Sequence, residues 1–187
     1  MKETNKNKIY SLTLSAVFIA LASVLSFIKV YKMPMGGSVT LFSMLPIVML
    51  SFMLGVKKGL VAAFCYSLLQ LLFGITMDGL FGWGLTPAAL IGTIFLDYII
   101  PFTALGLSAV FGKNNIFKMI CGITLALFIR FVCHFLSGVI IFGVFASGDS
   151  WIYSLTYNGS YMLPELVITL IGAVLLFSVP QIKKLIR

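Results

Sequence analysis

The chain has 187 residues, of which 60% are hydrophobic and only 10% are charged, and its mean hydropathy is +1.12. Soluble domains have about 25% charged residues, so this composition excludes an ordinary soluble protein and indicates an integral membrane protein. The formal net charge of +8 does not indicate nucleic acid binding, because that function needs a basic face on a folded domain.

Six apolar segments are predicted to cross the bilayer as helices, each of which needs about 20 residues. They cover, with approximate ends, residues 9–28, 42–56, 59–77, 86–111, 116–146 and 157–179. The second is short, and the fifth is long enough to tilt or to project beyond the lipid. The basic N-terminus ahead of the first segment imitates a signal peptide, but no A-x-A-like cleavage site follows, so this segment is predicted to remain. The sequence therefore predicts an all-α integral membrane protein with one six-helix domain, residues 1–187.

The basic residues predict how this domain is oriented. They gather before the first segment, between the second and third, between the fourth and fifth, and after the sixth, namely Lys2, Lys6, Lys8, Lys57, Lys58, Lys113, Lys118, Lys183, Lys184 and Arg187. All four locations fall on one side of a six-helix protein, whereas the loops on the other side contain only Lys29 and Lys32. By the positive-inside rule, both termini are predicted to be cytoplasmic, and the net charge reflects topology and contact with lipid headgroups.

Aromatic and polar residues collect in the loops predicted to face outward. The first loop, "KVYKMPMGGSVTLFS", has Pro34, Gly36 and Gly37, which predict a turn-rich segment able to cover a site. The third contains Trp83, and the fifth is "ASGDSWIYSLTYNGS".

Four ionisable residues fall within the apolar segments, where such groups are rare and usually face the protein interior, a partner or a water-filled cavity. They are Asp97, Arg130, His134 and Glu165. Arg130 and His134 are four residues apart and share one helical face, with Gly138 a turn further on. Gly138 would let a ligand or another backbone approach closely.

Two interpretations of these groups stay open. In the first, Asp97 and Arg130 form a structural ion pair. In the second, Asp97, His134 and the outer aromatic residues line a pocket that opens outward, the usual arrangement of a small-molecule site. Asp97 with Tyr98, Trp151 and Tyr153 would suit a flat cation through charge neutralisation and cation–π contact.

Several other functions lack their motifs. "GLSAVFGKNN" imitates a phosphate-binding P-loop, but it has five residues between the glycines and no Ser or Thr after Lys113, so no ATPase is predicted. The single histidine and three separate cysteines predict no metal site and no cofactor. No activated nucleophile is visible, so the chain is predicted not to be an enzyme. In the first segment, Ala16 and Ala20 form a small-residue face for close helix packing, either within the chain or against a membrane partner.

Four stretches together resemble a known family. They are "MPMGGSV", "FLDYIIPFTALG", "RFVCHFLSGVIIFG" and "WIYSLTYNGSYMLP". They are similar, in order and over nearly the whole chain, to the thiamine-specific substrate-binding (S) components of energy-coupling factor (ECF) transporters, the ThiT/YuaJ-like family. The resemblance implies a multi-pass protein of the bacterial cell membrane that captures thiamine from outside, under a cover formed by the first outer loop. It also implies docking through Ala16 and Ala20 onto a transmembrane coupling subunit with two cytoplasmic ATPase subunits, which supply the energy.

The resemblance also implies a set of ligand-binding residues. By motif they are Asp97, Tyr98, His134, Gly138, Tyr153 and Asn158. The sequence departs from the family where two tryptophans are usual, because Phe142 holds one position and Gly37 holds about the other. Trp83 or Trp151 would then compensate, since Phe is a poorer cation–π partner than Trp. The acid is commonly glutamate in the family, and Asp97 is one methylene shorter.

Three alternatives remain at this point. The same architecture would serve an S component for a thiamine precursor such as hydroxymethylpyrimidine, or for another vitamin. Asp97 with His134 would also make an acid–base pair in a membrane enzyme. A membrane scaffold that binds only partner proteins would have no ligand.

Overall fold

The computed structural model describes residues 5–34, 36–146 and 148–186. Lys2 and Arg187, which the charge prediction uses, lie outside the described residues. The α-helices are α1 (Asn5–Ser26), α2 (Leu45–Leu54), α3 (Val56–Thr76), α4 (Pro87–Thr93), α5 (Ile100–Thr103), α6 (Ile116–Ile140), α7 (Ser150–Ser178) and α8 (Pro180–Ile186). Two strands, β1 (Lys29–Lys32) and β2 (Ser38–Thr40), form an antiparallel hairpin. Shorter helical turns are η1 (Leu80–Gly82), η2 (Ile94–Ile99), η3 (Ala104–Leu107) and η4 (Phe142–Phe145).

The predicted helical membrane fold is confirmed, with one difference in length. Five helical stretches in the described residues are long and apolar enough to cross a membrane: α1, α3, the run Pro87–Leu107, α6 and α7. The predicted second span is only α2, whose 10 residues reach about 15 Å. Pro46 stands in its first turn, and Gly55, at φ 84°, ends it. The exact number of spans and the side of the termini stay predictions.

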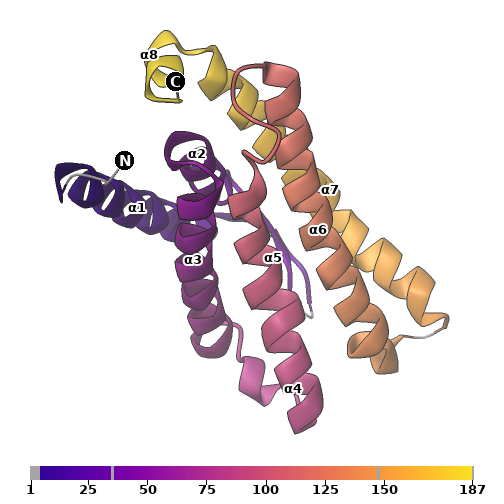
Figure 1. The fold of residues 1–187 in the computed structure, drawn as a ribbon. Helices are drawn as coiled ribbons and strands as arrows, with labels where there is room; N and C mark the ends of the chain where they lie inside the picture. The colour runs from indigo at the N-terminus through magenta and orange to yellow at the C-terminus, as the bar shows by residue number, and fades with distance from the viewer. Residues whose placement is uncertain (1–4, 35, 147, 187) are drawn as a thin grey trace.

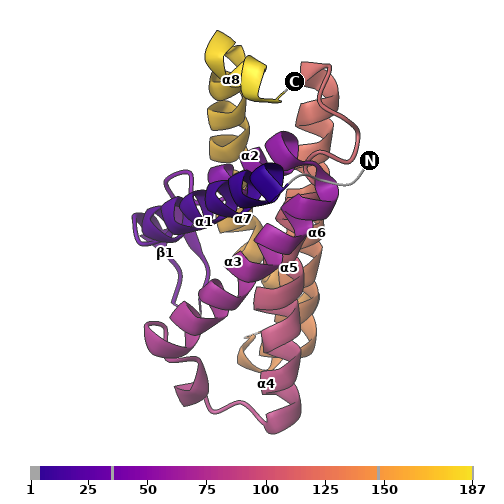
Figure 2. The same cartoon turned by 60° about the vertical axis from the view of Figure 1, so that its left-hand side comes forward.

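The long helices lie side by side, and α1 packs against one edge of them at an angle. Figures 1 and 2 show α3, α5, α6 and α7 running along the molecule, with α1 at a steep angle to them beside α2 and α3. The hairpin passes between α3 and α7 (Figure 1). The junction of α2 with α3, the loop before α6, and α8 lie at one end, whereas the turn from α6 into α7 lies at the other (Figure 1). The lysines next to the first three features therefore gather at one end of the molecule.

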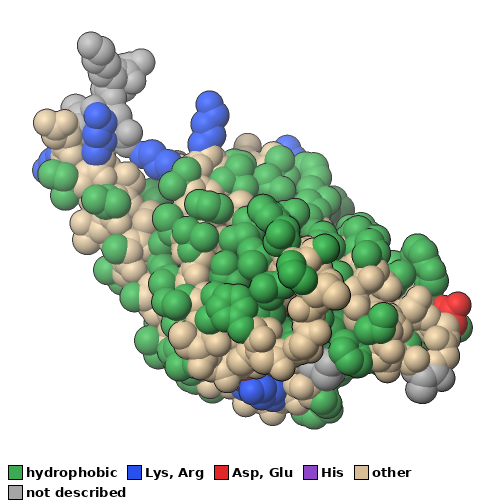
Figure 3. Space-filling model, turned by 90° about the horizontal axis from the view of Figure 1, so that it is seen from below, with side chains coloured by type: hydrophobic (Ala, Val, Ile, Leu, Met, Phe, Trp, Pro, Cys, Tyr) green, Lys and Arg blue, Asp and Glu red, His purple; other side chains and the backbone are tan. Residues whose placement is uncertain are grey.

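The core lies where these helices meet, and the outer surface is apolar. Tyr66 and Phe52 are fully buried and make edge-to-face contacts with Phe102 and Phe177, with ring centroids 5.6 Å and 5.1 Å apart. Figure 3 shows a face covered mostly by hydrophobic side chains. Such a surface suits lipid, because in water it would expose far more apolar area than a soluble protein tolerates.

The fourth predicted segment is a helix with an irregular middle. The turn η2 is π-helical and includes Asp97 and Tyr98. Pro101 follows it and lacks the N–H that would bond the carbonyl of residue 97 in a regular α-helix. Wide turns of this kind often occur at functional sites.

Two predicted loops are more ordered than expected. The first outer loop is the β1–β2 hairpin, in which Lys29 pairs with Thr40 and Lys32 with Ser38. The predicted start of the last helix at residue 157 is wrong, because α7 begins at Ser150. Asp149 caps that helix, since its Oδ1 accepts hydrogen bonds from the N–H groups of residues 151 and 152 at 2.8 Å and 3.0 Å.

Candidate functional site

A polar cavity lies beneath the hairpin, between the long helices. Nine of the ten side chains predicted to bind ligand line it: Gly37, Trp83, Asp97, Tyr98, His134, Gly138, Phe142, Tyr153 and Asn158. The structure also brings residues to it that the ligand prediction did not include, among them Lys29, Gly36, Thr40, Ser43, Tyr66, Gln70, Asp78, Phe102, Arg130, Tyr157, Tyr161 and Glu165. Most of these fall on α3, α7 and the hairpin. Those on α3 lie in no quoted motif, and the motifs on α7 and the hairpin marked only some of the residues that face inward.

Asp97 and His134 form the first polar contact in the cavity. The Nδ1 atom of His134 lies 2.9 Å from Oδ1 of Asp97, and the hydroxyl of Ser137 donates to Oδ2 of Asp97. The carboxylate thereby fixes the orientation of the imidazole ring. Because the carboxylate accepts the hydrogen bond from Nδ1, the Nε2 atom is left for other contacts. In the described part of the chain, the buried Nε2 atom has no hydrogen-bond partner.

The predicted ion pair between Asp97 and Arg130 is not formed among the described residues. Both oxygens of Asp97 are used by His134 and Ser137 instead. The guanidinium carbon of Arg130 lies 4.1 Å from the centroid of the Phe102 ring, in a cation–π contact. Its Nε and Nη1 atoms are buried without a partner among the described residues.

Glu165 ties the last helix to the hairpin. The side chain is 1% exposed, and Oε1 accepts hydrogen bonds from the backbone N–H of Thr40 at 2.5 Å and from its hydroxyl at 2.7 Å. The hydroxyls of Thr40 and Ser43 are 2.6 Å apart and continue the network towards α2. The sequence identified Glu165 only as an ionisable residue within a helix, because nothing in it showed that the hairpin would reach this depth.

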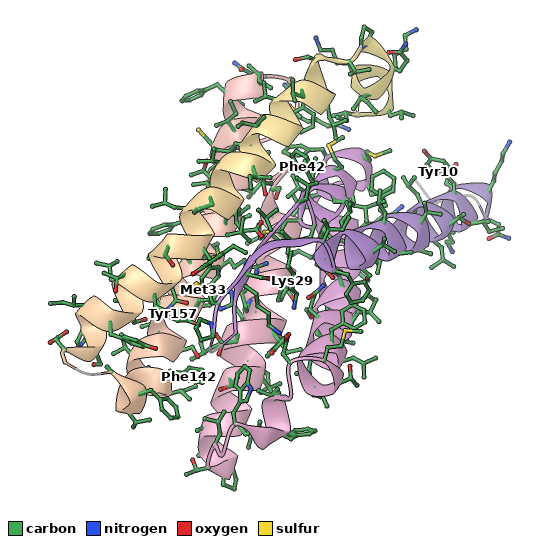
Figure 4. All side chains as sticks on the ribbon, turned by 180° about the vertical axis from the view of Figure 1, so that it is seen from behind. Tyr10, Lys29, Met33, Phe42, Phe142 and Tyr157 are labelled. Carbon is green, nitrogen blue, oxygen red and sulfur yellow. The ribbon has the colours of Figure 1, made fainter. Side chains whose placement is uncertain are left out.

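Glycines bring the hairpin close to the aromatic wall of the cavity. The hydroxyl of Tyr157 donates to the carbonyl of Gly36 at 2.9 Å. A Cβ on Gly37 would lie 2.8 Å from Cε1 of Tyr161, and one on Gly36 would lie 3.1 Å from Cη2 of Trp83. Both glycines have φ near +83°, where other residues are strained. Figure 4 shows Met33 of the hairpin beside Tyr157 of α7. The hairpin therefore covers the cavity, as predicted for the first outer loop.

Aromatic rings surround the polar groups. Trp83 and Phe142 make an edge-to-face contact with centroids 5.8 Å apart, and the indole N–H of Trp83 donates to the carbonyl of Asp78 at 3.0 Å. Tyr98 fits against α3 because Gly74 leaves room for its hydroxyl. At the mouth, the carboxylate of Asp78 is 3.4 Å from Lys29 and 3.0 Å from Lys32.

Gly138 and Asn158 belong to the packing of α6 on α7 as well as to the cavity. A Cβ on Gly138 would meet the hydroxyl of Ser154 and lie 2.9 Å from Nδ2 of Asn158. That amide nitrogen donates to the carbonyl of Ser154 at 3.0 Å, and the amide oxygen accepts from the hydroxyl of Tyr161 at 2.8 Å. Asn158 therefore positions Tyr161 in the cavity wall.

Trp151 is the one predicted ligand residue that lies outside the cavity. Its side chain is 57% exposed and packs against Phe135 with ring centroids 5.7 Å apart. The prediction treated residues 151 and 153 as loop positions that converge. In the helix they lie two residues apart, or about 200° around the axis, so only Tyr153 faces the cavity.

No group of three or more metal-binding side chains occurs in residues 5–34, 36–146 and 148–186. The fold and site together define a helical membrane protein with an internal polar cavity, covered by a hairpin and suited to a small, flat ligand. The model of the family described as "Thiamine transporter protein (Thia_YuaJ)" matches residues 12–185. The chain therefore belongs to this thiamine transporter family.

Individual relatives agree with this assignment. The "Thiamine transporter ThiT" of Bacillus subtilis (strain 168) is 36% identical over 186 residues, which cover 90% of this chain and 91% of the relative. That of Lacticaseibacillus paracasei is 30% identical over 156 residues, which cover 75% and 74%. A solved structure of ThiT from Listeria monocytogenes matches with a TM-score of 0.74 and 24% identity over 96% of this chain and 98% of the other, which shows the shared fold. The family consists of transporters rather than enzymes, and a location in the bacterial cell membrane follows.

Proposed function

We propose that this protein binds thiamine in the cavity and acts as the S component of an ECF transporter. The observation that supports binding most directly is the set of buried polar atoms without partners among the described residues. Five of them belong to side chains that line the cavity: Gln70 Nε2, Arg130 Nε and Nη1, His134 Nε2 and Glu165 Oε2. Buried polar groups without partners are costly, and a ligand with both donors and acceptors would satisfy them.

The charges inside the cavity favour a cation. At the mouth, Asp78 is already paired with two lysines. Deeper in the cavity, the carboxyl groups of Asp97 and Glu165 face one guanidinium, that of Arg130. If both carboxyl groups are ionised, this deeper part of the cavity has an excess of one negative charge, which the thiazolium ring of thiamine would neutralise. The group at the mouth, one carboxylate with two lysines, has an excess of one positive charge and lies nearer the solvent. Hydroxymethylpyrimidine has no positive charge, so the charge balance in the deeper part favours thiamine over this precursor.

Each cavity residue then has a role that its chemistry allows. Asp97 attracts the cation and orients His134, whose Nε2 atom meets a polar edge of the vitamin. Tyr98, Phe142 and Trp83 supply aromatic faces, and Trp83 stands in for the tryptophans usual in the family. Tyr153 and Asn158 add polar contacts or, for Asn158, hold Tyr161. Gly37 and Gly138 keep the cover and the helices close.

We expect partner proteins that dock on α1 to supply the energy for uptake. Ala16 and Ala20 are exposed on this helix, which fits a small-residue face that receives a transmembrane coupling subunit with two cytoplasmic ATPases. We expect Ala16→Trp or Ala20→Trp to abolish thiamine uptake in cells while purified protein still binds thiamine. Leu163→Trp, on the exposed surface of α7, is the control and should leave both unchanged. Normal uptake by both alanine variants would remove α1 as the docking face.

Calorimetry on the purified protein tests the ligand. We expect thiamine to bind, hydroxymethylpyrimidine to bind at least tenfold more weakly, and riboflavin and biotin not to bind. Equal affinity for thiamine and the neutral precursor would contradict the charge argument. Binding of another vitamin but not thiamine would contradict the proposed function.

A further inference from the structure

A second concave site lies apart from the cavity, on the surface between α1, α2 and the chain's last two helices. Eleven apolar side chains line this groove, among them Phe18 and Leu21 of α1, Met49 of α2, and Ile182 and Leu185 of α8. None of them lines the ligand cavity. In a bilayer such a hollow does not stay empty, because its walls would lose contacts that a hydrocarbon chain provides.

The short helix α8 forms one wall of the groove and carries basic residues beside it. Ile182 and Leu185 line it, and the two residues between them in the sequence, Lys183 and Lys184, are exposed. Figures 1 and 2 show α8 at one end of the molecule, the end that also holds the junction of α2 with α3. That end is the lysine-rich one, which the charge pattern predicts to be cytoplasmic. The helix that forms this wall of the groove therefore also carries two exposed lysines, which lie next in sequence to the lining residues and can reach the groove only along their flexible side chains.

This combination matches one class of molecule. Basic sites beside transmembrane helices at the cytoplasmic surface bind anionic lipid headgroups, and each nearby lysine contributes to that attraction. We propose that the groove binds an anionic phospholipid, with an acyl chain between α1 and α8 and its phosphate group at Lys183 and Lys184. The proposal uses residues that the thiamine site does not, so it stands whether or not thiamine is the ligand of the cavity.

Lipid retention measured by native mass spectrometry tests the proposal. The whole protein is purified, stripped of lipid, and titrated separately with phosphatidylglycerol and phosphatidylcholine of the same acyl chains. We expect the anionic lipid to bind at least tenfold more tightly. The double variant Lys183→Gln with Lys184→Gln should lose about tenfold of this affinity, and Leu185→Trp, which fills the groove, should weaken both lipids.

The control is Lys113→Gln with Lys118→Gln, which removes the same charge on the same predicted side but away from the groove. It should leave phosphatidylglycerol binding within about twofold of the unaltered protein. Three results would each overturn the proposal: equal affinity for the two lipids, an equal loss in the control, or unchanged binding in both groove variants. Each variant is first checked for an unaltered melting temperature and for unaltered binding of thiamine in the cavity. A folding defect is then not mistaken for a lost lipid site.

Discussion

Replacing Asp97 by Asn tests the polar centre of the cavity while changing its shape very little. Asp97 accepts from His134 at 2.9 Å and from the hydroxyl of Ser137. Hydrogen bonds to a charged group contribute about 1.5–3 kcal/mol each, and an amide has only one oxygen with which to accept them. The NH₂ group of Asn would therefore face one of the two donors. The substitution also removes the negative charge that we propose attracts the thiazolium ring.

From these two losses we expect Asp97→Asn to weaken thiamine binding by about 1.4–2.8 kcal/mol, or tenfold to a hundredfold. Calorimetry on the purified protein measures the change. Ser137→Ala is the matched control, because it removes one hydroxyl donor and keeps the carboxylate, so we expect a loss of about fivefold or less. Hydroxymethylpyrimidine should be affected less than thiamine, since it has no positive charge. The reasoning would be refuted by an Asn variant that is stably folded and binds thiamine within about twofold of the unaltered protein.

The remaining predictions concern the cover and the aromatic wall. The chain has two tryptophans, Trp83 in the cavity wall and Trp151 outside it. Thiamine should therefore quench the fluorescence of the Trp151→Phe variant and have almost no effect on that of Trp83→Phe. Quenching that is lost only when Trp151 is replaced would contradict this placement. Gly37→Ala should weaken thiamine binding several-fold more than Gly84→Ala. Both glycines have positive φ, but only a Cβ on Gly37 would meet a neighbour, Tyr161, at 2.8 Å. Similar losses of affinity in the two variants would mean that backbone strain alone matters. Glu165→Ala should lower the free energy of unfolding by about 1–3 kcal/mol and speed hydrogen exchange in the hairpin, because Thr40 loses its buried acceptor. Glu165→Gln should lower the free energy of unfolding less. Equal exchange rates in the hairpin of the two variants would rule out the link between Glu165 and the hairpin.

The sequence predicted the helical architecture and nine of the residues that line the cavity. The helices follow from local signals, whereas most of the nine follow from the resemblance to the family. Apolar length identified the membrane helices, and the four-residue spacing of Arg130 and His134 placed both on one face. The partners of those two residues depend on how helices pack, which spacing does not determine. Spacing therefore could not show that His134, and not Arg130, is the residue that contacts Asp97.

The errors also have physical causes. Gly148, Asp149 and Ser150 are typical of a loop, so the helix start at Ser150 was placed seven residues too late. That error moved Trp151 into the predicted site, because a loop lets neighbouring side chains converge and a helix separates them. Tyr161 and Glu165 were missed as cavity residues, since their neighbours on the hairpin are more than 100 residues away in the sequence.

The π-helical turn η2 sets the alignment of two neighbouring helices. On α6, His134 and Arg130 are four residues apart, and their partners across the interface, Asp97 and Phe102, are five apart. A regular α-helix would turn residues 97 and 102 about 140° away from each other, so only one of the two contacts would form. Because the wide turn holds one extra residue, the five-residue step from Asp97 to Phe102 matches the four-residue step from Arg130 to His134 on α6. Deleting one residue from Ile94–Leu96, which removes the wide turn but keeps Asp97 and Phe102 five residues apart, should therefore separate one of these pairs while leaving the length of the helix almost unchanged.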